Sequence, residues 1–272
     1  MTPQVSGLFI YPLKGARAVS LTAASLAPYG LKDDRTWMLT DDRGRFLSQR
    51  THPLLAQIQA HVTAQGLKLS CPDSPPIYVQ AFDGGAKCQV RVWDDHLSAW
   101  DAGEEVAVWL RQALGVSARL VRVSSGSERF ADRMYVGEAS VPVAFSDGYP
   151  ILVCSVSSLA ELNRRLPEPV PMDRFRPNVV VDGLEAFAED HIEILTIGKT
   201  HLRLVKPCTR CQVPSIDQCT GLPSTDPMPA LKTFRFDRAL RGVTFGVNAI
   251  VMGSIEESLL LGQPLTIQGR RP

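Results

Sequence analysis

The feature that most constrains the fold is a succession of short strand-like runs, each closed by turn residues. In the first hundred residues these runs occupy positions 5–12, 36–40, 45–48, 58–62, 67–70, 77–79 and 88–93. Residues 41–44 join two of the runs with turn chemistry, which predicts a hairpin. Short strands at this spacing are typical of an antiparallel sheet or a small barrel.

Helical patterns are fewer. Asp101 and the two glutamates after it supply a cap and an acidic first turn, and apolar residues then recur at helical spacing until Gly115. A second helix is expected from about residue 157 to the residue before Pro167. Strand patterns resume at positions 178–181, 192–195, 201–204, 243–251 and 264–267. The sequence therefore predicts a strand-dominated α+β fold with a few helices.

A chain of 272 residues can form one large domain or two modest ones. We expect an N-terminal β-barrel-type domain over residues 1–124 and a C-terminal β-barrel domain with a few helices over residues 125–272. The serine-rich stretch 124–127 marks the expected boundary. This stretch and residues 224–229 are interpreted as loops or mobile lids.

The charge balance limits the classes of partner. Lys and Arg number 29, Asp and Glu number 28, and the formal net charge is +1. No overall field therefore favours nucleic acid or an anionic membrane, and we expect neither as a partner. An anionic ligand must instead meet a local cluster of basic residues.

The N-terminal residues do not read as an export signal, because a basic first region is absent and Pro12 interrupts the short apolar stretch. No run of about 18 apolar residues is present to span a bilayer. We therefore expect a cytoplasmic protein whose six cysteines are free thiols or ligands rather than disulfides.

A Cys-x-x-Cys pair, Cys208 and Cys211, is the strongest chemical signal. Such a pair can be half of a zinc site, which would need Cys219 and His201 as further ligands, or a redox dithiol, or two packing residues. The spacing is not that of a known zinc framework, and no helix is predicted to begin at the pair, as a low-pKa dithiol would require.

The residues beside the pair favour a functional thiolate. Lys206 and Arg210 flank it, and nearby cations stabilise an ionised sulfur that acts as a nucleophile or as a ligand for a soft metal. From these residues alone the alternatives stay open.

Four segments in this order carry a resemblance to a known family: residues 11–15 (YPLKG), 30–37 (GLKDDRTW) with 44–50 (GRFLSQR), 174–178 (RFRPN) and 206–211 (KPCTRC). They extend over nearly the whole chain. The chain resembles proteins that join a MOSC N-terminal β-barrel domain to a MOSC domain, among them the mitochondrial amidoxime-reducing component and the bacterial YcbX-like proteins.

The resemblance implies a molybdenum cofactor, with Cys211 as the protein ligand to the metal and hence the catalytic residue. It places cofactor-binding residues at Lys14, Arg35, Arg176, Asn178, Thr209, Arg210 and Asn248. Arginine forks and a lysine charge suit an anionic phosphate and pterin. The wider family is also associated with pyridoxal phosphate, for which the sequence offers no specific site.

The resemblance implies a reductase of N-hydroxylated compounds, such as hydroxylated nucleobases, amidoximes or hydroxylamines. No cysteine set for a C-terminal iron–sulfur cluster precedes Pro272, so electrons are expected from a separate flavin or iron–sulfur protein. Gly15 replaces a serine or cysteine of many relatives, and residues 212–221 depart from the usual continuation. The missing cluster and the altered loop favour an alternative function, a carrier of molybdenum cofactor or sulfur without turnover of its own. A third hypothesis is a zinc-stabilised binding module.

Overall fold

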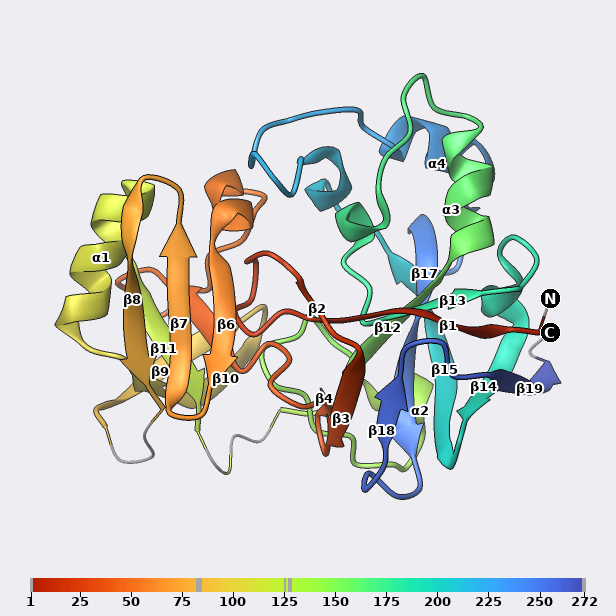
Figure 1. Ribbon diagram of the computed structural model, residues 1–272, viewed down its shortest axis with the longest axis horizontal. Coiled ribbons are helices and arrows are strands. Elements are labelled where there is room, and N and C mark those ends of the chain that lie inside the picture. Colours follow the sequence, from red (N-terminus) through yellow and green to blue (C-terminus); the bar gives the residue numbers. More distant parts are fainter. Residues whose placement is uncertain (1, 82–84, 125, 127–128, 271–272) are drawn as a thin grey trace.

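The computed structural model describes residues 2–81, 85–124, 126 and 129–270. Two lobes lie side by side (Figure 1): one contains α1 and β5–β11, and the other contains β1–β4, β12–β19 and the remaining helices. Strands predominate in both lobes, which confirms the predicted α+β class. None of the described helices has both the length and the apolar character needed to span a bilayer.

The second lobe is built on one large sheet. Its strands in spatial order are β19 (Leu265–Arg270), β14 (Ile192–Ile197), β15 (Thr200–Thr209), β17 (Gly242–Met252), β12 (Ile151–Ser155), β13 (Val179–Asp182), β1 (Gln4–Ile10) and β2 (Val19–Ser20), with β16 (Phe236–Asp237) on β17. A smaller sheet contains β18 (Ser258–Leu260), β3 (Ala23–Ala27) and β4 (Gly30–Leu31). Apolar side chains from both sheets form one buried core.

Helices cover the outside of this lobe. They are α2 (Arg133–Val136), α3 (Val156–Asn163) and α4 (Met228–Phe234). The helix α3 connects β12 to the parallel strand β13, and the side chain of Ser155 caps its first turn by accepting from the Ser157 backbone N–H. Leu162 and Leu231 anchor α3 and α4 in a second core beneath the large sheet.

The first lobe contains two smaller sheets. One has the order β5 (Trp37–Thr40), β11 (Arg119–Val123), β10 (Asp95–Asp101) and β9 (Lys87–Val92), and the other β6 (Gln59–Thr63), β7 (Gly66–Cys71) and β8 (Ser74–Gln80). The helix α1 (Glu104–Leu114) covers them and buries Trp109 and Leu110, and a left-handed Gly115 ends it as predicted.

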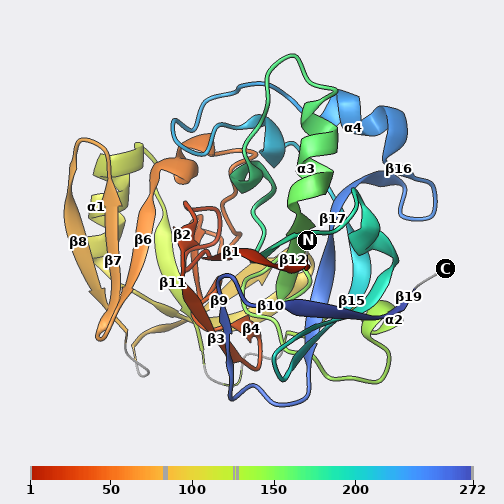
Figure 2. The same ribbon diagram turned by 45° about the vertical axis from the view of Figure 1, so that its right-hand side comes forward.

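The chain begins in the second lobe and only then enters the first. Strand β1 pairs with β13, with Gln4 opposite Asp182, and β3 pairs with β18. Figure 2 shows the N-terminus and β1 in the lobe that contains β12 and β17. The stretch 124–127, where the boundary was predicted, lies partly outside the described residues. The division at residues 124 and 125 therefore stays a prediction.

Several predicted elements differ from the structure. The hairpin at 36–48 forms only its first arm as a strand, because Arg45 and Phe46 make isolated bridges. The cap of α1 is Gly103, while Asp101 binds Arg119. Strand β15 continues through Thr209 instead of ending near residue 205, and α4 begins inside the loop predicted at 224–229.

Candidate functional site

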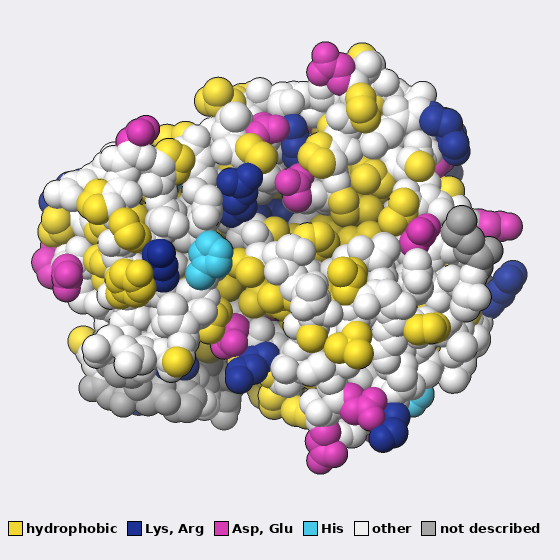
Figure 3. Space-filling model, viewed as in Figure 1, with side chains coloured by type: hydrophobic (Ala, Val, Ile, Leu, Met, Phe, Trp, Pro, Cys, Tyr) yellow, Lys and Arg dark blue, Asp and Glu magenta, His cyan; other side chains and the backbone are white. Residues whose placement is uncertain are grey.

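One cavity of about 940 Å³ lies between the lobes. Its lining includes all eight residues that the sequence singled out, which are Lys14, Arg35, Arg176, Asn178, Thr209, Arg210, Cys211 and Asn248. They come from the loop after β1, the turn before β5, the segment before β13, the end of β15 and the middle of β17. On the face shown in Figure 3, basic and hydrophobic side chains gather at a hollow between the lobes, with acidic side chains around it.

Two arginines of the cavity are organised by Tyr11. The guanidinium carbons of Arg35 and Arg176 lie 4.1 and 4.2 Å from the centre of its ring. Both arginines have positive φ, +48° and +56°, a strained backbone that tertiary contacts must hold. The buried Tyr11 hydroxyl donates to the Pro177 carbonyl at 3.0 Å, and its burial raises its pKa although both cations oppose that effect.

Protein contacts fix the direction of each guanidinium. Arg35 donates to the Asp34 carboxylate at 2.6 Å and to Asn178 Oδ1 at 3.0 Å. Arg176 donates to the Ala16 carbonyl at 2.7 Å, and burial lowers its pKa to about 10. Because these contacts use only part of each five-donor fork, both arginines keep donors for an anion.

Asn178 is 1% exposed, and its side chain mainly connects neighbouring segments by hydrogen bonds. Besides accepting from Arg35, its side-chain oxygen accepts from the Leu152 backbone N–H at 3.1 Å, and its nitrogen donates to the Phe9 carbonyl at 3.2 Å. The Asn248 side chain donates to the Lys206 carbonyl at 3.2 Å. A cofactor contact of either asparagine stays a prediction.

Lys14 is 7% exposed, and its ammonium is held by two oxygens. It donates to the Phe145 carbonyl at 2.7 Å and forms an ion pair of 2.5 Å with Asp147, whose carboxylate faces the cavity. Burial lowers the pKa of Lys14, and Asp147 opposes that effect. Sequence patterns gave no sign of Asp147. Tyr11 belongs to one of the recognisable segments, but its spacing alone indicates no role.

The two cysteines of the pair have different environments. Cys208 lies in β15, is partly buried, and accepts from Arg210 Nη1 at 3.1 Å. Cys211 follows the strand, is exposed and lines the cavity. Arg210 also donates from Nη2 to the Phe175 carbonyl at 2.8 Å, while its buried Nε has no hydrogen-bond partner. Cys208 therefore positions Arg210, and Cys211 presents its thiol.

The further ligands that a zinc site would need are elsewhere engaged. Cys219 accepts from Arg17 at 3.0 Å, and His201 Nδ1 shares a hydrogen bond of 2.9 Å with Thr196. In the part of the chain that the structure describes, no three His, Cys, Asp or Glu side chains group closely enough to hold a metal ion. A metal at Cys211 must therefore bring most of its own ligands.

The loop after Cys211 is fastened to the first lobe. The side-chain amides of Gln49 and Gln218, both nearly fully buried, donate to each other at 2.9 Å in each direction. Arg174 forms a 3.0 Å ion pair with Asp217, and Arg176 donates to Gln218 at 3.2 Å. These contacts keep the exposed thiol and the arginines in one frame. Gln49 belongs to one of the recognisable segments, but its spacing alone indicates no role.

The donor set fits an anionic cofactor whose metal accepts a thiolate. Seven Lys or Arg and four Asp line the cavity, so its excess of positive charge is larger than the +1 of the whole chain. One exposed thiol lies on the same lining. Thiolates select soft metals, and arginine forks bind phosphate in two-pronged fashion.

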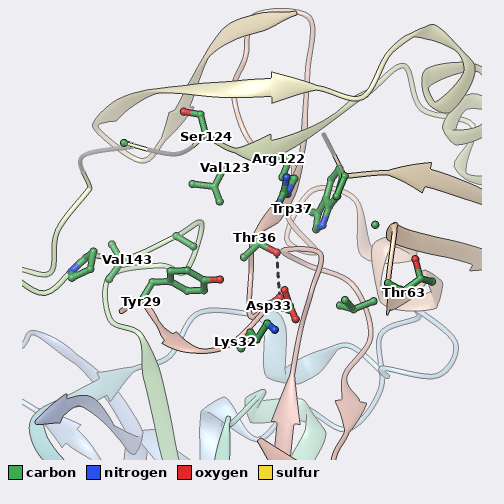
Figure 4. A pocket seen from close by; sticks show the side chains of 17 residues that line it. Tyr29, Lys32, Asp33, Thr36, Trp37, Thr63, Arg122, Val123, Ser124 and Val143 are labelled. Atoms are coloured by element: carbon green, nitrogen blue, oxygen red, sulfur yellow. Dashed lines mark hydrogen bonds between the residues drawn. The ribbon is translucent and has the colours of Figure 1, made fainter. Parts of the chain in front are cut away.

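A second cavity, of about 580 Å³, has a different character (Figure 4). Tyr29, Lys32, Asp33 and Arg122 are the titratable side chains of its described lining, in which no cysteine occurs. Thr36 closes one side by donating to the Asp33 carbonyl at 3.3 Å. Because thiol and clustered arginines are missing from this lining, the larger cavity is the candidate site.

Known proteins resemble this chain along most of its length. The MOSC N-terminal beta barrel domain matches residues 2–117, and the MOSC domain matches residues 141–258. Mitochondrial amidoxime reducing component 2 of Rattus norvegicus is 32% identical over 243 residues, which cover 85% of this chain and 72% of that protein. Mitochondrial amidoxime-reducing component 1 of Mus musculus is 32% identical, covering 85% and 71%. Molybdenum cofactor sulfurase of Danio rerio is 32% identical, covering 89% of this chain but 31% of that protein.

Proposed function

The chain belongs to the family that joins a MOSC N-terminal beta barrel domain to a MOSC domain and includes the mitochondrial amidoxime-reducing components, and on that premise we propose that it is a molybdenum-cofactor-dependent reductase of N-hydroxylated compounds. The observation that carries the proposal is the larger cavity, where an exposed thiol and a set of fixed cations share one lining. The proposed substrates are amidoximes, hydroxylamines and N-hydroxylated nucleobases.

Each residue has a role that its contacts support. Cys211 would hold the metal through its sulfur, since it is the exposed cysteine of the lining. Arg35 and Arg176 would bind the phosphate and pterin edges with their free donors, and Arg210, which lines the same cavity, would add its positive charge. Lys14 would exchange Asp147 for a phosphate oxygen, because that carboxylate lies at the cavity surface.

The reaction breaks an N–O bond. When bound, the cofactor would supply two electrons, which together with two protons convert the N-hydroxyl group to an N–H group and water. The protein would fix the cofactor and orient the substrate. Reactants that are already held in position lose less entropy on reaching the transition state, which lowers the activation free energy. We propose that a separate flavin or iron–sulfur protein returns the electrons and that the protein works in the cytoplasm.

Metal content and turnover test the proposal. The protein is expressed in a host that makes the cofactor, its molybdenum is measured by mass spectrometry, and benzamidoxime reduction is assayed with a chemical electron donor. We expect near-stoichiometric molybdenum and turnover in the wild type, and loss of both in Cys211→Ala. Cys219→Ala is the matched control, because Cys219 is also exposed but does not line the cavity. Equal molybdenum in Cys211→Ala and the wild type would contradict the assignment.

A second candidate is a carrier of the cofactor or of a sulfur atom on Cys211. It is favoured by the match of 89% of this chain to part of a molybdenum cofactor sulfurase. A carrier would contain molybdenum or pterin but would not reduce an amidoxime with any electron donor. The same experiment therefore separates the two functions.

A further inference from the structure

Trp93, on the lining of the larger cavity, has a strained backbone conformation. Strands β9 and β10 form a hairpin in which Val92 pairs with Asp95, so Trp93 and Asp94 are the whole turn. Trp93 has a φ of +57°, in the left-handed region. Two-residue hairpin turns with positive φ favour glycine or asparagine there, and a bulky aromatic residue is an outlier. A residue kept under such strain points to a function of its side chain.

The turn is fastened to the wall of the cavity on both sides of the ring. Trp93 Nε1 donates to Asp147 Oδ1 at 3.3 Å, the same carboxylate oxygen that holds Lys14. Arg129, 5% exposed, binds Asp95 at 2.7 Å and also donates to the Asp147 carbonyl at 2.8 Å. The hairpin tip and the loop containing Asp147 are therefore one framework, and the indole is held in place at the site.

The indole surface is suited to flat groups. Its ring meets Phe46 edge to face at 5.0 Å, and the planar guanidinium of Arg50 lies over it at 4.5 Å. Trp93 nevertheless keeps 41% of its surface exposed, and Phe130, also on the lining, is 50% exposed. An aromatic face stacks on planar π systems and attracts planar cations such as an amidinium.

From the strain, the anchoring and the exposed part of the indole, we infer that Trp93 forms the substrate subsite of the cavity and selects N-hydroxylated groups attached to a flat aromatic ring over aliphatic ones. This inference rests on the proposed reductase function and adds its substrate class. N-hydroxylated nucleobases and aryl amidoximes share the required chemistry, a π face next to the N–O bond. Stacking of a ring on an aromatic side chain changes affinity by about tenfold.

The test compares Trp93→Gly and Trp93→Phe with the wild type, each loaded with cofactor. Glycine suits a positive φ, so Trp93→Gly is expected to fold, which a thermal melt and the molybdenum content verify. The ratio of kcat/KM for benzamidoxime to that for acetamidoxime should fall about tenfold in Trp93→Gly, mainly through KM, and less in Trp93→Phe. N-hydroxycytosine is expected to behave like benzamidoxime.

Asp73→Gly is the matched control. Asp73 has a φ of +60° in the two-residue turn between β7 and β8, and it does not line the cavity. This variant relieves the same kind of strain without touching the subsite, so its substrate ratio should equal that of the wild type.

A second readout does not depend on turnover. Calorimetric binding of benzamidine, the product of benzamidoxime reduction, should weaken about tenfold in Trp93→Gly. If the loaded wild type reduces nothing but benzamidine binding still depends on Trp93, the proposed reaction fails and the subsite stands. If both substrates lose activity equally in Trp93→Gly, Trp93 serves another purpose, such as docking of the electron donor, and the inference is overturned. An unchanged ratio with unchanged benzamidine binding overturns it as well.

Discussion

A buried carboxyl group makes the stability of this protein depend on pH. Glu189 lies in the short 3₁₀ helix Ala188–His191, is 0% exposed, and accepts from the Ser158 hydroxyl at 2.7 Å. Burial raises the pKa of Glu189 from 4.5 to about 7, because ionisation inside the protein lacks the stabilisation that water gives. The Ser158 hydrogen bond favours the charged form but does not offset burial.

The sign and size of the effect are set by proton linkage. Between about pH 4.5 and pH 7 the folded protein keeps a proton on Glu189 that the unfolded chain has released, so rising pH favours unfolding. A change in pKa from 4.5 to about 7, at about 1.4 kcal/mol for each tenfold change in proton affinity, corresponds to about 3 kcal/mol. The contribution of neutral Glu189 to stability is thus complete below the unfolded pKa and is lost as pH rises through about 7.

The variant Glu189→Gln removes this dependence, because an amide keeps a similar shape and stays neutral. Urea denaturation is measured for both proteins from about pH 5 to about pH 8, where most of the effect falls. Relative to the wild type, the free energy of unfolding of Glu189→Gln should rise by about 2–3 kcal/mol over this range. Glu185→Gln is the control, since Glu185 is exposed and close in sequence. Parallel pH curves for Glu189→Gln and the wild type would refute the reasoning.

Two further predictions concern the framework of the cavity. Tyr11→Phe should lower the free energy of unfolding by about 1 kcal/mol, because the hydroxyl contact is lost. Tyr11→Leu should lower it by about 1–2 kcal/mol more, because the ring beneath Arg35 and Arg176 is lost. Equal stability of the two variants in urea denaturation would contradict the cation–ring contribution. Gln49→Ala and Gln218→Ala should each lower the free energy of unfolding by about 1–3 kcal/mol, since each leaves a buried amide unpaired. A double-mutant cycle should give a coupling energy above about 0.5 kcal/mol between the two residues. Additive effects would show that the two amides act independently.

Local patterns predicted the alternating strand β7 and the fully buried strand β5, but they missed β12. Strand β7 alternates between core and surface, so its period of two is visible in the sequence. Strand β12 is buried at every position, and such a short apolar run cannot be told from part of a helix by periodicity. The pairing of β1 with β13 joins residues about 170 positions apart, a distance over which local patterns carry no information.

The candidate site was predictable to the extent that its residues lie in recognisable segments. Lys14, Arg35 and Arg176 were named from such segments, and the structure brings them to one cavity. The contacts that position these side chains could not be predicted, because Tyr11 acts through its place beneath two guanidiniums. The place of Trp93 at the cavity could not be predicted either, because it lies in a turn that normally favours another residue type. Contacts of this kind depend on tertiary structure rather than on spacing along the chain.

The difference between the two cysteines shows why extrapolation along a strand fails at this site. The pairing of β15 with β17 has two irregularities of register: an extra residue in β15 between Leu204 and Lys206, and an extra residue in β17 opposite the step from Pro207 to Thr209. An extra residue in a strand reverses the side-chain alternation beyond it, and such bulges are frequent beside active sites. Regular alternation from the middle of β15 would therefore assign the wrong face to the residues beyond the first bulge. Beyond the first bulge, Cys208 lies partly buried against Arg210, whereas Cys211 follows the end of the strand with its thiol exposed.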